Sequence, residues 1–129
     1  MSVELTHALR LLPRVPHGRA AATVRALPWV LPASHLVTGD QLLLRVPTAR
    51  GAALPLDGTV VAYEAHDEGD AAGSTAWQAQ LVGIVSVTDP ERGARSAFPP
   101  APRYARHPEA TYLRLAPRYA AVHRPGGAA

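Results

Sequence analysis

The fold class is decided by residues 29–46, which read WVLPASHLVTGDQLLLRV. Two apolar runs flank Thr38-Gly39-Asp40, a combination that is typical of a turn. Pro28 and Pro32 favour an extended chain in the first run, and the second run, from Gln41 to Val46, is strongly apolar. The stretch therefore predicts a β-hairpin.

Further strands are predicted on both sides of this hairpin. An alternating pattern begins at Arg19, where small and apolar residues take every second position. The later candidates are residues 59–65, 75–87, 111–115 and 119–123. Six or seven strands over this length predict a mostly β fold, in which an antiparallel sheet closes on itself.

Two or three short helices complete the prediction. Ser2 can cap a helix that runs to about Leu12, because apolar residues recur there at helical spacing and Pro13 ends the pattern. Residues 48–56 are rich in alanine and predict a second short helix. Asp89, with Pro90 at the first helical position, predicts the start of a third.

The composition limits the chemistry of the 129-residue chain, a length that predicts one domain. Cysteine, lysine and asparagine are absent, and all 13 basic residues are arginine. The missing cysteine excludes disulfides, thiolate nucleophiles and zinc–cysteine sites. The missing lysine excludes Schiff-base catalysis by lysine and the Walker lysine of P-loop nucleoside triphosphatases. No apolar run is uninterrupted enough for a transmembrane helix or a signal peptide, so we expect a cytoplasmic protein without membrane contact.

The charge is unevenly spread along the chain. Residues 61–91 carry six acidic residues and no arginine, whereas residues 92–129 carry seven arginines and one glutamate. The arginines alternate with prolines and accompany no nucleic-acid-binding motif, so the sequence favours a solvated basic surface over nucleic acid. Acidic residues and a histidine between Glu64 and Asp70 lack calcium-loop spacing, and no metal site is predicted there.

The order of segments resembles the pyridoxamine 5′-phosphate oxidase-like family, also called FMN-binding split barrels. The resemblance covers about residues 3–123 and is greatest to actinobacterial members. It rests on a short N-terminal helix, Leu27-Pro28-Trp29-Val30-Leu31-Pro32, the strand ending in Arg45, and the later segments that include Trp77 and Val87-Thr88-Asp89-Pro90. It implies a split β-barrel, a homodimer and a flavin in each of two clefts between subunits.

The family holds the flavin phosphate with an Arg, a Thr, and then a Ser or Thr followed by a Lys after the third strand. Aligned on this pattern, Arg45 matches the Arg, Val46 replaces the Thr, Arg50 stands at the Ser or Thr, and Gly51 replaces the Lys. Thr48 and Arg50 could supply the hydroxyl and the cation if the loop shifts by one residue. Alternatively the loop no longer binds phosphate and Arg50 only faces solvent.

Four more residues are cofactor candidates by the same resemblance. Ala33, Ser34 and His35 match the strand that lies along the flavin ring, although His35 could instead be structural. Trp77 matches an aromatic residue near the cofactor and the dimer interface, with core packing as the alternative. Tyr112 matches a late aromatic residue, for which packing is also expected.

The resemblance implies an FMN-binding protein, and from it we expect a flavin-dependent oxidoreductase with an unidentified small-molecule substrate. No proton donor or other catalytic residue can be named. Val46 and Gly51 leave an alternative open: a split barrel without FMN that binds another partner, a deazaflavin or haem. Residues 1–125 form the expected domain, and residues 126–129 an expected flexible tail.

Overall fold

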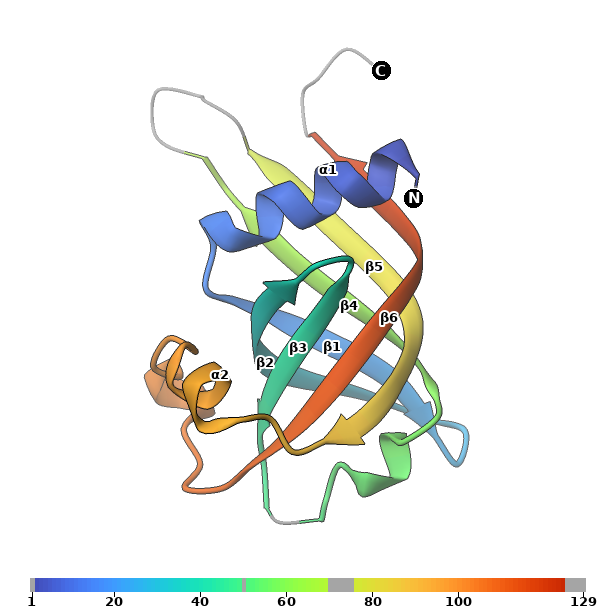
Figure 1. The fold of residues 1–129 in the computed structure, drawn as a ribbon. Coiled ribbons are helices and arrows are strands. Elements are labelled where there is room, and N and C mark those ends of the chain that lie inside the picture. The colour runs from blue at the N-terminus through green and yellow to red at the C-terminus, as the bar shows by residue number, and fades with distance from the viewer. Residues whose placement is uncertain (1, 50, 70–75, 125–129) are drawn as a thin grey trace.

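A computed structural model describes residues 2–49, 51–69 and 76–124; the expected tail lies outside this part. It is a closed antiparallel barrel of six strands in the order β1-β2-β3-β6-β5-β4 (Figure 1). The strands are β1 His17–Val24, β2 Leu27–Thr38, β3 Gln41–Pro47, β4 Val60–Asp67, β5 Trp77–Thr88 and β6 Ala110–His123. The predicted hairpin is confirmed as β2 and β3, with Gly39 at a positive φ of 65° in the turn.

Alternating burial along the strands builds most of the core. In β5, Trp77, Ala79, Leu81, Gly83 and Val85 are buried, while the residues that alternate with them are exposed or half-buried. In β3, Leu42, Leu44 and Val46 belong to the core, and Leu43 between them is buried as well. The closed barrel thus confirms the predicted fold class.

The first helix, α1 (Val3–Leu11), lies across one end of the barrel over β5 and β6 (Figure 1). The Ser2 Oγ accepts from the Leu5 amide at 3.0 Å, so the predicted N-cap is confirmed. Pro13 ends the helix, and the chain continues as a 3₁₀ turn, η1 (Leu12–Arg14). Buried Leu5, Ala8 and Leu12 join the barrel core.

The last two predicted strands are one strand. β6 is continuous because a β-bulge lies opposite the step from Val82 to Gly83 and leaves Arg118 outside the paired register. The bulge changes the inward phase from Leu113 and Leu115 to Ala120. When the alternation of buried and exposed residues reverses within one strand, the sequence pattern is the same as that of two strands with a break between them.

Two helix predictions need correction. The described residues of the segment predicted as the second helix, 48–49 and 51–56, form turns and a short 3₁₀ helix, η2 (Leu54–Leu56), not an α-helix, and Gly51 has a φ of 80°. Helix α2 (Arg92–Ser96) begins later than predicted, with Glu91 at the N-cap position and no side-chain cap bond. Asp89 instead pairs with Arg95. A further 3₁₀ turn, η3 (Arg103–Ala105), precedes β6.

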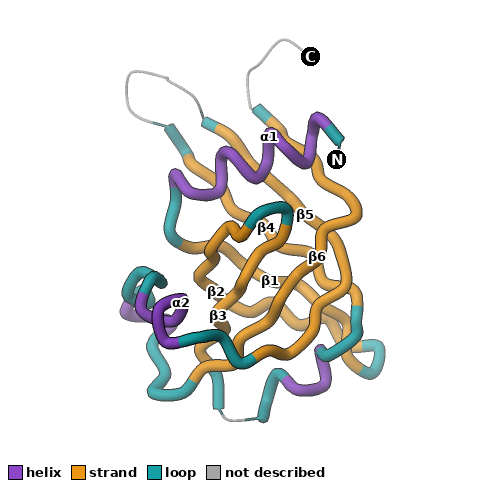
Figure 2. The backbone as a smooth tube through the Cα atoms, in the orientation of Figure 1, coloured by secondary structure: helices purple, strands orange, loops and turns teal. Residues whose placement is uncertain are grey.

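The connection from β5 to β6 covers one outer face of the barrel. Figure 2 shows α2 and its flanking loops beside β2 and β3, outside the sheet. Phe98 in this connection is 7% exposed although it lies outside the barrel. The covered face contains Ser34 and Arg45, two of the cofactor candidates from the sequence.

Candidate functional site

Arg45 and Ser34 lie opposite each other on the outer face of the β2–β3 hairpin. The Arg45 Nη2 donates to the Pro99 carbonyl at 2.6 Å and is 3.5 Å from the Ser34 Oγ. The guanidinium also lies 5.3 Å from the centre of the Phe98 ring. Arg45 therefore joins the hairpin to the covering segment.

Two separate cavities lie on either side of the contact between Arg45 and Pro99. Pro99 lines one of about 640 Å³, which runs beside His35 and Val37 and has mostly apolar walls. Arg45 lines the other, of about 380 Å³, whose walls are mostly polar. Volumes of this order are typical of small-molecule sites.

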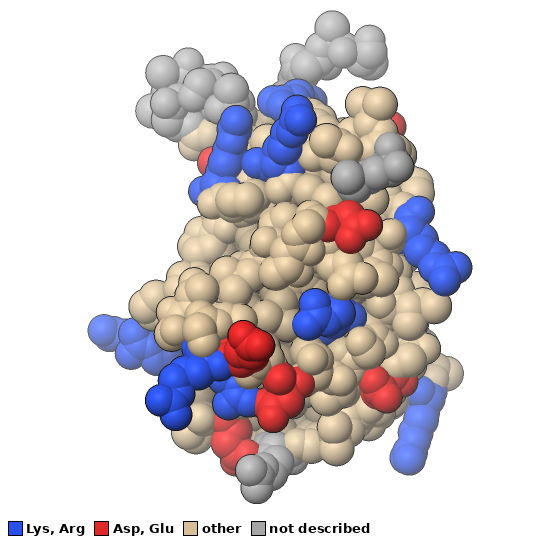
Figure 3. All heavy atoms as spheres, viewed as in Figure 1, with Lys and Arg blue, Asp and Glu red and all other residues tan. Residues whose placement is uncertain are grey.

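The smaller cavity is cationic, and we call it the arginine cavity. Its charged or ionisable lining residues are Arg45, Arg95, Arg106, His107 and Glu109. Three arginines against one glutamate give a formal charge of +2 with neutral histidine. Figure 3 shows basic and acidic side chains side by side over the region of α2.

A third cavity of about 440 Å³ adjoins the arginine cavity and shares Arg95 and Tyr112 with it. Gly51, Thr88 and Thr111 also line it. Its position connects the loop after β3 to the start of β6, where the Thr48 amide donates to the Glu109 carbonyl at 3.2 Å.

His35 is buried and both of its ring nitrogens are engaged. The Nε2 lies 2.7 Å from the Leu12 carbonyl, which can only accept, so Nε2 carries the proton. The Nδ1 is then the acceptor for the Tyr63 hydroxyl. Burial lowers the pKa of His35, against the opposing effect of its backbone acceptors.

Tyr63 completes this buried contact from β4. Burial, followed by the charge of Glu64, raises the pKa of the Tyr63 hydroxyl well above its ordinary value, so the group stays neutral and can donate. A Cβ on Gly18 would lie 2.5 Å from the Tyr63 oxygen and 2.3 Å from the Glu64 carbonyl. The glycine therefore leaves room for the tyrosine beside β1.

The structure brings together only some of the predicted cofactor residues. Ser34, Arg45, Thr48 and Gly51 line or border the outer cavities, whereas Arg50 lies outside the described residues. Four other residues are buried in the barrel core or at its margin. They are Ala33, His35, Val46 and Trp77.

Trp77 takes the core alternative, and Val46 also lies in the core. Their exposed fractions are 2% and 0%, and both side chains belong to the hydrophobic core of the barrel. Val46 stands at the family's threonine position, but its side chain does not face the outer cavities. Neither side chain is placed to contact a ligand beside Arg45.

Sequence reasoning missed Arg95, Arg106 and Phe98. The segment from Phe98 to Pro108 has an irregular pattern, and its arginines were interpreted as a solvated surface. Contacts such as Arg95 over the Tyr112 ring, at 5.5 Å, join residues that no local pattern relates. The one available signal was the arginine excess after residue 91.

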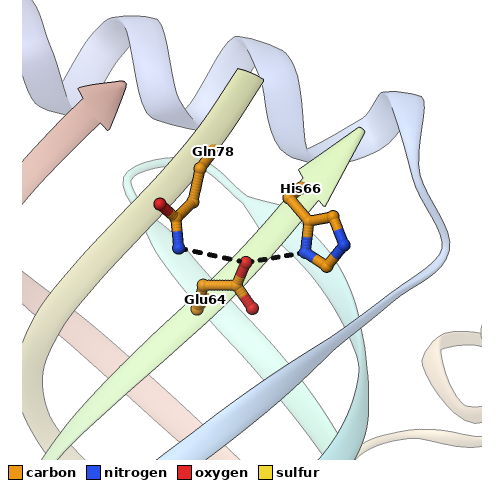
Figure 4. Close-up of polar contacts among 3 residues, drawn as sticks. All are labelled: Glu64, His66 and Gln78. Atoms are coloured by element: carbon orange, nitrogen blue, oxygen red, sulfur yellow. Dashed lines mark hydrogen bonds and ion pairs between the residues drawn. The ribbon is translucent and has the colours of Figure 1, made fainter. Parts of the chain in front are cut away.

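The acidic strand end carries a separate polar group. Glu64 accepts from the ring of His66 at 2.7 Å and from Gln78 at 3.4 Å on the outside of β4 and β5 (Figure 4). In the described residues, no group of three acidic, histidine or cysteine side chains is arranged to hold a metal. No described helix is long and apolar enough to cross a membrane.

The family model of pyridoxamine 5′-phosphate oxidase matches residues 4–124. The chain belongs to this family. The curated protein Rv0080 of Mycobacterium tuberculosis (strain ATCC 25618 / H37Rv) is 35% identical over 101 residues. That match covers 74% of this chain and 66% of Rv0080, slightly less than two thirds of the relative's length.

Solved structures of low sequence identity share the oxidase-family fold. An FAD-binding protein from Mycobacterium smegmatis superposes with a TM-score of 0.70 at 20% identity, covering 96% of this chain and 97% of that one. An FAD- and haem-binding protein from the same organism gives 0.68 at 18% identity, covering 98% and 73%. At these identities the likeness supports the split-barrel fold alone.

Proposed function

We propose that this chain binds a flavin nucleotide on the outer face of β2 and β3. The observation that carries the proposal is the position of Arg45, which lines a cationic cavity and donates to Pro99 in the wall of a mostly apolar one. A flavin nucleotide has a planar ring system at one end and a phosphate at the other. Family membership and the FAD-binding protein of similar fold support this class of ligand.

The residues present fit the two ends of such a ligand. The larger cavity, beside His35 to Thr38, would take the ring along β2, as the family resemblance implies. Its walls include Pro13, Val15 and Pro16, which exclude water from one side. Ala33 and Ser34 precede this wall on β2, and the ring would lie against the segment that begins at His35, whose imidazole already has two partners.

A bound flavin would supply two-electron transfer to a small-molecule substrate, and the chain would act as an oxidoreductase. The protein's part would be orientation and exclusion of water. Gly51 lines the third cavity, which adjoins the arginine cavity, and among the described residues of the loop after β3 Thr48 has the side-chain donor that could reach a ligand.

One observation favours a second candidate, a binding protein without flavin. Arg45 already donates to the Pro99 carbonyl, and Phe98 packs against its guanidinium. If this contact never opens, the two cavities stay separate and a nucleotide cannot span them. Haem or a deazaflavin would then have to bind within the larger cavity alone.

The visible absorption spectrum of the purified protein, followed by titration with FMN, distinguishes the candidates. We expect flavin bands or saturable quenching of FMN fluorescence. Arg45→Met should weaken FMN binding at least tenfold, while the matched variant Arg92→Met, in exposed α2, should not. A Soret band would favour haem, and a colourless wild type that ignores FMN would reject the proposal.

We also propose a homodimer, as expected from the resemblance. A row of outward-facing apolar residues crosses five adjacent strands and makes an apolar belt. In register, these residues are Val30, Ala21, Ala62, Val82 and Tyr119. Val60 and Ile84 extend it and are 61% and 40% exposed. A second copy would cover the part of this belt around Val60 and Ile84.

A further inference from the structure

In the described part of the loop after β3, two positions lack the side chains that the family uses for phosphate, and Arg50 lies outside the described residues. Val46 is fully buried in the core, and Gly51 contributes no side chain. The amide of Thr48 is bound to the Glu109 carbonyl. Among the loop's described residues, Thr48 alone has a side-chain hydrogen-bond donor.

The arginine cavity lies beside this loop and provides cationic side chains, which the described residues of the loop do not have. Arg95 comes from α2 and Arg106 from the segment that follows η3, so both belong to the β5–β6 connection. Arg45 joins them from β3. Three guanidinium groups around one cavity provide a cationic surface that suits a dianion.

Each arginine is anchored through part of its guanidinium. Arg95 pairs with Asp89, donates from Nε to the Pro90 carbonyl at 2.9 Å, and lies over the Tyr112 ring. Arg106 donates from Nε to the Ala101 carbonyl at 3.4 Å. Both bonds of Arg45 leave from Nη2. Since a guanidinium has five N–H donors, these bonds use only part of the capacity of each group.

We propose that the phosphate of the bound nucleotide is held by Arg95 and Arg106, together with Arg45, in place of the loop after β3. This rests on the proposed flavin site and assigns its phosphate end. The chemical class recognised is a phosphate monoester. Arginine can bind such a group through two parallel N–H bonds, which a single lysine cannot provide.

The assignment predicts how the protein distinguishes FMN from riboflavin, which lacks the phosphate. In the wild type, FMN should bind much more tightly than riboflavin. Arg106→Gln should reduce this ratio about tenfold, the equivalent of about 1.4 kcal/mol, while riboflavin affinity stays the same. Arg106→Lys should recover part of the loss, because the charge remains but paired donation does not.

The experiment is a fluorescence titration of wild type, Arg106→Gln, Arg106→Lys and Arg95→Gln with both ligands. Arg92→Gln is the matched control, since it removes an exposed α2 arginine that does not line the cavity. Thermal melting of each variant identifies loss of folding, which is a concern for Arg95→Gln because Arg95 packs on Tyr112.

The outcomes separate this inference from the proposed function. If wild type binds FMN and both glutamine variants keep the full preference over riboflavin, the arginine assignment is wrong and flavin binding stands. If wild type binds neither ligand, the flavin proposal fails. In that case thermal stabilisation by inorganic phosphate at constant ionic strength tests the anion site itself. Its loss in Arg106→Gln would support the site, and no stabilisation of wild type would reject it.

Discussion

His35 connects three elements through the two nitrogens of one ring. It belongs to β2, accepts from Tyr63 of β4, and donates to the carbonyl that ends α1. A protonated ring would carry a hydrogen on Nδ1, where the Tyr63 hydroxyl now donates. The neutral form of the ring is therefore part of the fold.

This residue predicts a pH dependence of stability. The folded pKa of His35 is depressed by burial, so below about pH 6.5 the unfolded chain binds a proton that the folded chain does not. Stability should fall as the pH decreases from 7.5 towards 5. Thermal melts of wild type and His35→Gln should show a gap that is widest at pH 7.5 and narrows at pH 5.

Tyr63→Phe is the control for this prediction, since it removes the hydroxyl and keeps His35 buried. It should lower the melting temperature at every pH without removing the pH dependence. A gap between wild type and His35→Gln that is constant from pH 7.5 to 5 would contradict the role assigned to the ring.

The sequence predicted some residues of the site correctly and missed others, and the reason differs from residue to residue. Arg45 was found, because the segment Leu42-Leu43-Leu44-Arg45 is part of a recognisable order of segments. Val46 and Trp77 were cofactor candidates by alignment, but the alternation of their strands turns both into the core. Arg95 and Arg106 lie far along the chain from Arg45, so their meeting depends on the path of the β5–β6 connection.

Among the elements, β6 explains both the success and the error of the fold prediction. Its two halves have clear strand patterns, and both were found. Their junction was misread because the bulge at Arg118 changes the inward phase. Local patterns report which face is buried, but not that one strand can switch faces without ending.

Gly83 makes this junction possible, and its substitution is a test of it. A Cβ at Gly83 would lie 2.0 Å from the Ala116 carbonyl oxygen, a backbone atom that cannot move aside. Gly83→Ala should therefore lower the free energy of unfolding by about 1–3 kcal/mol or more. Urea unfolding measures the change.

Gly93→Ala is the matched control. A Cβ there meets nothing within 4 Å, and the position lies in α2. Alanine is the better helix former, so this variant should be neutral or more stable by up to about 1 kcal/mol. If the two substitutions changed the free energy of unfolding equally, the close approach of Gly83 to the Ala116 carbonyl would not be what requires a glycine there.

At the scale of the whole molecule, the apolar belt tests the proposed assembly. Wild type should have a mass in solution of twice its 13.6 kDa chain mass. Val60→Arg combined with Ile84→Arg should give the monomer, because two charges would be buried at the contact. Light scattering after size exclusion measures the masses.

Val3→Arg serves as the control for the belt, since Val3 is 86% exposed on α1 and distant in sequence from the belt strands. That variant should remain a dimer. A monomeric wild type would refute the assembly, and a dimeric double variant would place the contact elsewhere on the surface.

The ring of paired strands limits how this protein can associate with others. Because β1 pairs with β4, each described strand has a neighbouring strand on both sides, although residues 27–33 of β2 pair with β1 alone. The closed ring therefore opposes the addition of a partner peptide to the sheet and the edge-to-edge stacking of chains in the manner of amyloid. Recognition then depends mainly on side chains on the outside of the barrel, where single substitutions can tune it without altering the fold.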